Sequence, residues 1–307
     1  MHDNFNKMKY LNYSEIDFEK WDKCIDRAPN SRLYATSWFL DRMATRWNAL
    51  IWGDYKYIMP VPYRKKLGIK YSYQPLYCQQ LGIFPSPPAN IAEAFFSALY
   101  QKFHFTDIQL NAENHPGENS KNLQIVPRKN YLLQLNTDFE TIYSGFSKNT
   151  RRNIAKAEQN NISYIENISL EEFLHFKRNN LTGKILASDF QKLISIIAYS
   201  LHHGFGKITG VYSQENELCA AVFFCRWKNR VIYLNAVSSK EGKAYRAMFF
   251  LIHHFCQSMA GSNLTLDFEG SVLPGIARFF EGFGATPEIY YRLHFNHLPF
   301  PLNLIKK

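Results

Sequence analysis

Four basic side chains lie close together in the segment 147–158, and their spacing suits the binding of phosphate. On a helix, Lys148, Arg152 and Lys156 follow one another at i, i+4 and i+8. Arg151 flanks them, and the opposite face carries the apolar residues Ile142, Phe146, Ile154 and Ala157. Arginine binds phosphate through two parallel hydrogen bonds, and an anionic ligand would relieve the repulsion among four like charges. The alternative is an ordinary solvated basic face.

A second segment, 238–247, lies between a predicted strand and a long predicted helix. Its residues Ser239, Gly242 and Ala244 resemble the loop Q/R-x-x-G-x-G/A of GNAT acyltransferases, with serine at the first position. In that family the backbone N–H groups of the loop hold the pyrophosphate of coenzyme A at a helix N-terminus. The resemblance implies a cofactor site at Gly242, Lys243, Ala244 and Arg246. The alternative is that Gly242 is only a turn residue before the helix.

Two carboxylates end the predicted strand 264–268. Alternation along the strand places Asp267 and Glu269 on one face, at the end where α/β sheets usually hold ligand groups. They could orient an amine acceptor or act as a base, and we therefore name them as candidate catalytic residues. The alternative is a structural ion pair with Arg246 or Arg278.

Other residues predict neither a metal site nor a disulfide framework. The adjacent pairs His202–His203 and His253–His254 lack the i, i+4 spacing of metal ligands. The five cysteines are odd in number and contain no C-x-x-C pair, which is typical of reduced thiols in a cytosolic protein. Cys256 lies in an apolar helix, where we expect it to be inert packing.

The charge balance favours anionic partners. Thirty-six Lys and Arg against 26 Asp and Glu give a net charge of +10, which attracts nucleic acid, nucleotide phosphates or an acidic membrane surface. The alternative is that the charge serves solubility alone. Residues 1–6 show no apolar signal region, and the apolar run 248–255 is too short to span a bilayer. We expect a cytoplasmic protein, with peripheral contact at the inner membrane surface left open.

The chain of 307 residues is predicted to form an α/β (α+β) fold of two tandem units. Each half shows a strand, helices, antiparallel strands, a helix and a final strand, so each is expected to hold a mixed, mostly antiparallel sheet flanked by helices. The second half is predicted to start with the strand 131–135, followed by helices at 138–160, 169–180 and 188–203. The turn-rich stretch 115–120 places the boundary near residue 130, giving units 1–130 and 131–307.

Several stretches resemble the Fem-type (FemABX-like) peptidyltransferases and their bacterial relatives in the GNAT superfamily. They are S-K-N-T-R-R-N-I-A-K-A-E at 147–158, L-D-F-E-G-S at 266–271, and I-A-R-F-F-E-G-F-G-A at 276–285 followed by Tyr290. The likeness is good over residues 130–296. In the first half it is looser and rests on Trp38, Pro60, 63–66 and 79–84.

The resemblance implies two GNAT-like units with a ligand channel, and an enzyme that moves an aminoacyl group onto a cell-wall (peptidoglycan) precursor. Lys148, Arg151 and Arg152 would hold precursor phosphates or the tRNA backbone, with Lys156 and Arg278 as further binding residues. Tyr233 and Tyr290 would line the channel. The acyl donor would be aminoacyl-tRNA or acyl-CoA, with no permanently bound cofactor and no metal.

Two alternatives follow from departures from the family. The chain lacks the long helical arm that many Fem transferases carry, so an acyl-CoA-dependent N-acetyltransferase that acts on a small amine stays open. Because serine replaces the first basic position of the loop, a non-catalytic binder of RNA or of an anionic lipid or nucleotide stays open as well. The oligomeric state is not predicted.

Overall fold

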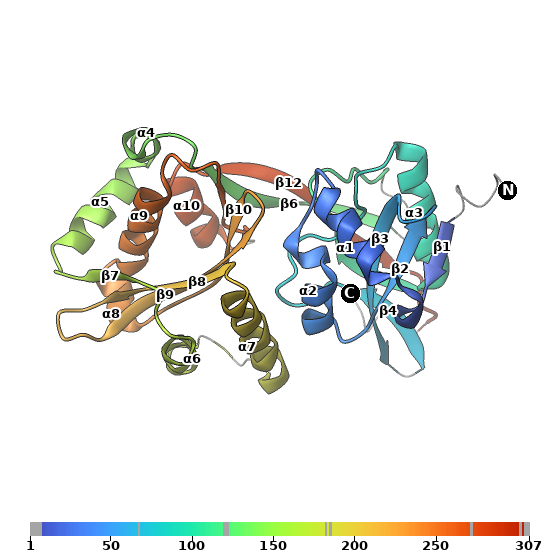
Figure 1. The fold of residues 1–307 in the computed structure, drawn as a ribbon, viewed down its shortest axis with the longest axis horizontal. Coiled ribbons are helices and arrows are strands. Elements are labelled where there is room, and N and C mark those ends of the chain that lie inside the picture. The colour runs from blue at the N-terminus through green and yellow to red at the C-terminus, as the bar shows by residue number, and fades with distance from the viewer. Residues whose placement is uncertain are drawn as a thin grey trace. The chain divides into compact units, whose positions relative to one another are not determined.

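The protein is described from a computed structural model, which covers residues 8–66, 68–118, 123–181, 183, 186–270, 273–300 and 303. The chain forms two compact units (Figure 1). The first comprises Met1–Arg128 and Ile289–Lys307, and the second is Lys129–Glu288. The predicted α/β class with mixed sheets is confirmed. Residues 1–6, 119–120 and 271, which entered the sequence arguments, lie outside the described residues.

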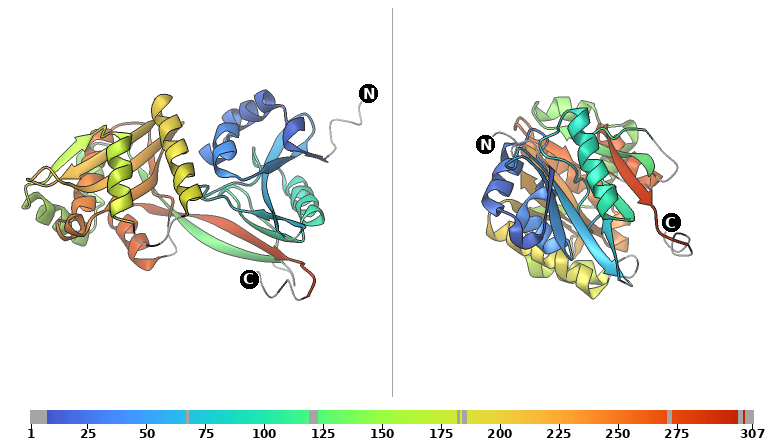
Figure 2. Two further views of the ribbon diagram at one scale, coloured as in Figure 1. Left: turned by 90° about the horizontal axis from the view of Figure 1, so that it is seen from below. Right: turned by 90° about the vertical axis from the view of Figure 1, so that its right-hand side faces the viewer.

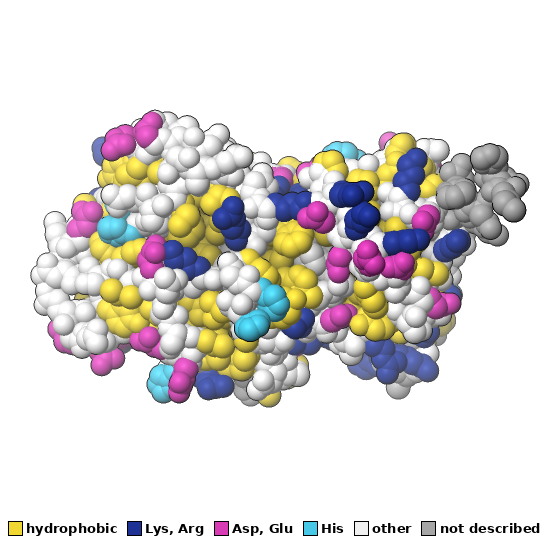
Figure 3. All heavy atoms as spheres, in the orientation of Figure 1, with side chains coloured by type: hydrophobic (Ala, Val, Ile, Leu, Met, Phe, Trp, Pro, Cys, Tyr) yellow, Lys and Arg dark blue, Asp and Glu magenta, His cyan; other side chains and the backbone are white. Residues whose placement is uncertain are grey.

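The first unit surrounds an aromatic core that includes the fully buried Phe95 and Phe103. Its tip between β3 and β4 carries exposed Arg64, Lys65, Lys66 and Lys70, which form a basic group on the face drawn in Figure 3. The elements are β1 (Met8–Leu11), η1 (Tyr13–Glu15), α1 (Phe18–Arg27), η2 (Leu33–Ala35), α2 (Ser37–Met43), β2 (Trp47–Trp52), β3 (Tyr57–Lys66), β4 (Ile69–Tyr73), α3 (Ala89–Lys102), β5 (Phe105–Gln109) and β12 (Thr286–Asn296).

The second unit has helices on both faces of its sheet. Figures 1 and 2 show α6 and α7 on one face, and α5 and α9 on the other. The elements are β6 (Leu123–Gln134), α4 (Phe139–Ser144), α5 (Lys148–Glu158), β7 (Ser163–Glu166), α6 (Leu170–Asn179), α7 (Ala187–His202), β8 (Gly206–Tyr212), β9 (Leu218–Trp227), β10 (Arg230–Ser238), α8 (Lys240–Ala244), α9 (Ala247–Met259), β11 (Thr265–Asp267) and α10 (Pro274–Gly282).

The two units repeat one strand order. In the first, β1, β2, β3 and β4 pair antiparallel in sequence, β5 pairs parallel to β4, and β12 pairs antiparallel to β5. In the second, β7, β8, β9 and β10 pair in the same way, β11 pairs parallel to β10, and β6 pairs antiparallel to β11. A helical connection, α3 or α8–α9, joins the two parallel strands each time, as such a pairing requires.

Some predicted boundaries differ from the structure. The predicted strand 131–135 corresponds to the end of β6, which stops at Gln134 and pairs with β11 near the start of the second unit; the strands that repeat the order of the first unit begin with β7. Residues 138–160 form two helices, because the chain turns at Gly145 and Ser147 caps α5 by accepting a hydrogen bond from the Thr150 N–H. Residues 289–307, predicted in the second unit, belong to the first, because β12 pairs with β5 and Arg292 pairs with Asp107.

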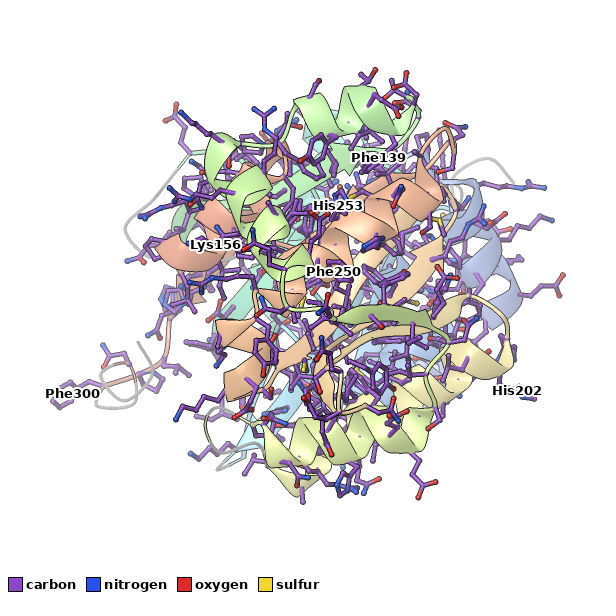
Figure 4. The ribbon with its side chains drawn as sticks, turned by 90° about the vertical axis from the view of Figure 1, so that its left-hand side faces the viewer. Phe139, Lys156, His202, Phe250, His253 and Phe300 are labelled. Atoms are coloured by element: carbon purple, nitrogen blue, oxygen red, sulfur yellow. The ribbon has the colours of Figure 1, made fainter. Side chains whose placement is uncertain are left out.

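The core of the second unit lies around α9. Phe255 of α9 stacks on Phe224 of β9 with ring centroids 3.9 Å apart. His253 faces Phe139 of α4 at 5.1 Å, as the side-chain view in Figure 4 shows. Because His253 is only 8% exposed among aromatic rings, burial lowers its pKa to about 4. This histidine is therefore a neutral core residue, as expected for a residue without metal-ligand spacing.

Candidate functional site

A cavity of about 630 Å³ lies within the second unit. The residues around it come from the end of α6, the last part of β10, α8, the start of α9, and α10. They are Lys177, Asn180, Leu181, Tyr233, Ala236, Val237, Ser238, Gly242, Lys243, Arg246, Met248, Phe249, Gly275, Ile276, Phe279 and Phe280. The size and the mixture of apolar walls with a few polar groups are typical of a small-molecule or cofactor site.

Tyr233 lines this cavity at an irregularity in β10. The pairing of β10 with β9 shifts register between Tyr233 and Asn235, which is the signature of a β-bulge. The Tyr233 hydroxyl donates a hydrogen bond to the Met248 sulfur at 3.3 Å, and burial raises the pKa of Tyr233. Tyr233 is therefore neutral, and its hydroxyl is held by the Met248 sulfur at the cavity wall. Its role in binding a ligand stays a prediction.

The predicted long helix 242–260 is interrupted beside the cavity. Arg246 adopts a left-handed backbone conformation (φ +61°), so that α8 ends and α9 begins at Ala247. Met248 and Phe249, in the first turn of α9, line the cavity. A helix N-terminus carries a partial positive charge and favours anions. The break therefore places a second N-terminus at the cavity, which a continuous helix would lack.

Close packing explains why a glycine stands at position 242, and the sequence alone did not indicate this. Ser239 caps α8 by accepting a hydrogen bond from the Gly242 N–H at 2.9 Å. A Cβ atom at position 242 would collide with the carbonyl oxygen of Cys219 in β9. Glycine is therefore required for close packing of α8 on β9, and it lines the cavity as well.

Three cations line the cavity, and none of its described lining residues is acidic. Lys243 and Arg246 are exposed, whereas Lys177 is only 7% exposed. Burial lowers the pKa of Lys177 to about 8. Lys177 is not among the candidate residues identified from the sequence. One sequence pattern indicates its burial: Lys177 stands four residues after Phe173, on the apolar face of α6.

Asp267 is held in an ion pair and does not line the cavity. The side chain of Asp267 is 3% exposed, and one oxygen accepts a hydrogen bond from Arg230 at 2.8 Å. Its other oxygen accepts from the Glu269 backbone N–H at 2.9 Å, and Glu288 binds the same guanidinium at 3.0 Å. The structural alternative stated for Asp267 thus describes what is observed, with Arg230 as the partner in place of Arg246 or Arg278.

The strand register explains this pairing. Ile232 of β10 lies opposite Asp267 of β11, and Arg230 stands two residues before Ile232 on the same face. Glu269 follows in a left-handed conformation (φ +63°) and also lies outside the cavity lining.

The basic helix forms as predicted but is separate from the cavity. Lys148, Arg151, Arg152 and Lys156 are exposed on α5, and Figure 4 shows Lys156 on that helix. On α5 itself Ile154 and Ala157 are buried, which confirms the predicted amphipathic face; Ile142 and Phe146 are also buried but lie on α4 and in the turn before α5. Arg152 donates a hydrogen bond to the Asn149 side chain at 2.9 Å. The phosphate-binding role of this face stays a prediction.

The structure brings together four of the residues named from the sequence: Tyr233, Gly242, Lys243 and Arg246. The others do not line the cavity. Ala244 and Arg278 are exposed on α8 and α10, and Tyr290 is buried in the part of β12 that belongs to the first unit. Among the described residues, no group of three potential metal ligands occurs, and no helix is long and apolar enough to cross a membrane.

Comparison with known proteins gives matches by structure only. No family model matches the sequence, and no curated protein matches it. FemX superposes with a TM-score of 0.61 at 12% identity, over 97% of this chain and 99% of FemX. The C-terminal domain of a putative lysylphosphatidylglycerol synthetase from Agrobacterium fabrum gives 0.54 at 9% identity, over 94% of each chain.

A third structure contains a GCN5-related region. This fungal multi-domain β-N-acetylglucosaminidase carries a glucosamine N-acetyltransferase region and gives a TM-score of 0.51 at 9% identity, over 94% of this chain and 38% of its own. At these identities the likeness establishes the fold. The chain therefore has a GNAT-like α/β fold, similar over nearly its whole length to that of FemX.

Proposed function

We propose that the protein is an acyltransferase that moves an aminoacyl or acyl group onto an amine, with its reaction site in the cavity of the second unit. The observation that carries the proposal is the combination of the β10 bulge, the N-terminus of α9 and three cations around one apolar cavity. The likeness to FemX supports it at the level of the fold.

The chemistry needs no metal, because the donor carbonyl is already activated as an ester or thioester. The amine nitrogen attacks the carbonyl carbon and forms the C–N bond. The bond to the ribose oxygen or the coenzyme sulfur breaks, and the amine proton passes to that leaving group. If the Tyr233 hydroxyl turns from the Met248 sulfur to the donor carbonyl, it can donate its hydrogen bond to the oxyanion that forms, and the apolar walls position both reactants.

For the donor we propose aminoacyl-tRNA or acyl-CoA, and for the acceptor an amine of a cell-wall precursor. Both donors carry phosphates, which Lys243, Arg246 and the N-terminus of α9 would attract. The exposed basic face of α5 offers a second region for phosphates of a tRNA or a precursor. Activity on such substrates would take place in the cytoplasm, with peripheral contact at the membrane surface.

A second candidate is a non-catalytic binder of an anionic ligand such as RNA, a nucleotide or a lipid headgroup. The observation that favours it is the engagement of Asp267 by Arg230, together with the lack of any acidic side chain among the described lining residues. Such a site would bind an anion without offering a carboxylate base. The two candidates predict the same binding and differ in turnover.

The test begins with the thermal stability of the protein in coenzyme A, acetyl-CoA, a UDP-linked muramoyl peptide and bulk tRNA. A ligand that binds only the folded state raises the melting temperature. Ile276→Trp places a larger ring at an exposed position of the cavity wall and should remove the shift. Leu273→Trp is the matched control, because Leu273 is also exposed next to α10 but does not line the cavity.

The pattern of shifts identifies the donor. A shift with tRNA or the muramoyl peptide supports the aminoacyl-transfer proposal, and a shift with the coenzyme A species alone supports an ordinary N-acyltransferase. Equal shifts in wild type and Ile276→Trp would contradict binding in this cavity.

A further inference from the structure

Lys177, whose side chain is largely buried and reaches the cavity, is the group in the second unit that the proposed reaction leaves unexplained. Lys177 sits on the inner face of α6 between Phe173 and Asn180, and 93% of its surface is removed from solvent. Lysine is rarely buried to this extent unless it is paired. Within the described part of the chain, no carboxylate lies within ion-pair distance of it and no group accepts a hydrogen bond from it.

The surroundings of Lys177 disfavour its charged form, because burial of the side chain lowers its pKa to about 8. At neutral pH the side chain is still mostly charged. Its charge is thus available at the cavity, where a ligand that carries a negative charge can pair with it.

The surroundings select for an anion. Lys243 and Arg246 line the same cavity, and its described lining contains no carboxylate that could neutralise these charges. Lys177 comes from α6, an element separate from the α8–α9 junction that holds the other two cations. We propose that the ammonium of Lys177 pairs with an oxyanion, a carboxylate or a phosphate, of the ligand that occupies the cavity.

This pairing narrows the substrate class of the proposed acyltransferase. That the bound anion is a substrate rests on the proposed function, whereas the binding of an anion does not. A ligand with a cationic side chain, such as a lysyl or arginyl group, would meet three positive charges in the cavity and be rejected. The substrate portion bound there is therefore anionic, with an apolar part against Phe249 and Phe279.

Calorimetric titration with simple anions tests this without any turnover. Sulfate stands for a phosphate and succinate for a carboxylate, because both stay fully ionised at pH 8 and cannot themselves take up protons. Since the pKa of Lys177 is about 8, anion binding at pH 8 should draw about half a proton onto the protein. Titrations in two buffers of different ionisation enthalpy measure this uptake.

Three variants separate the pairing role from a merely structural one. Lys177→Met should weaken anion binding about ten- to a hundredfold and abolish the proton uptake. Arg178→Met removes the same charge from the adjacent, exposed position outside the cavity and should change neither binding nor uptake. Lys177→Arg should retain binding without proton uptake, because arginine stays charged.

Each outcome decides the proposal. Binding of sulfate alone assigns the partner as a phosphate, binding of succinate alone assigns a carboxylate, and both support the pairing if Lys177→Met loses them. No anion binding by the wild type, or equal binding by Lys177→Met, would overturn it. A protein that binds anions through Lys177 but transfers no acyl group would contradict the proposed function while leaving this inference intact.

Discussion

Replacement of Asp267 by asparagine should destabilise the protein without touching the cavity. The carboxylate is 3% exposed and bonds Arg230 at 2.8 Å, and the amide of asparagine cannot neutralise that guanidinium. Removing one partner of a buried ion pair typically lowers the free energy of unfolding by 3–5 kcal/mol. Because Glu288 still binds Arg230 at 3.0 Å, we expect the low end of that range, about 3 kcal/mol.

Urea unfolding followed by circular dichroism measures this change, since the signal reports both units. The difference in unfolding free energy is the shift in the urea midpoint multiplied by m, the slope of the unfolding free energy against urea concentration. Asp54→Asn is the control, because the pair of Asp54 with Lys20 is exposed to solvent and should contribute little to stability. If Asp267→Asn leaves the unfolding free energy unchanged but abolishes acyl transfer, Asp267 acts in the chemistry and our interpretation is wrong.

Three further predictions concern other parts of the second unit. His253 is buried with a pKa of about 4, so wild type should lose about 3 kcal/mol of stability as pH falls from 6.5 to 4, and His253→Gln should lose less; identical acid-unfolding curves would contradict this. Arg152→Glu should weaken tRNA binding in a filter assay, and the loss should be largest at low salt. If the variant binds tRNA as tightly as wild type at both low and high salt, the phosphate role is wrong. Gly242→Ala should lower the unfolding free energy by about 2 kcal/mol through its clash with Cys219, whereas Gly117→Ala, in open space, should be neutral; equal urea midpoints would refute the packing argument.

Local patterns in the sequence predicted the parts of the fold that depend on one element at a time. The apolar side of α5 was readable because Ile154 and Ala157 recur at helical spacing and are buried. Gly242 and Arg246 were assigned to a ligand site from the loop pattern between a strand and a helix, and Tyr233 from the family resemblance; all three line the cavity.

Features that depend on pairing between distant segments were not readable. The bond between Arg230 and Asp267 joins residues 37 positions apart and follows from the parallel register of β10 and β11. The assignment of β12 to the first unit depends likewise on its pairing with β5. Lys177 was missed because its burial reflects what α6 packs against, while its residue type suggests a solvated surface position.

The most direct measurement of the central claim is transfer of a radiolabelled acyl group to an amine. Purified wild type, Ile276→Trp and Leu273→Trp would each be incubated with the donor that stabilises the wild type and with an amine-bearing cell-wall precursor. We expect an amide product with wild type and Leu273→Trp, and its loss with Ile276→Trp. Unchanged product formation by Ile276→Trp would show that the reaction takes place outside the cavity, and no product from any of the three would favour the binding protein.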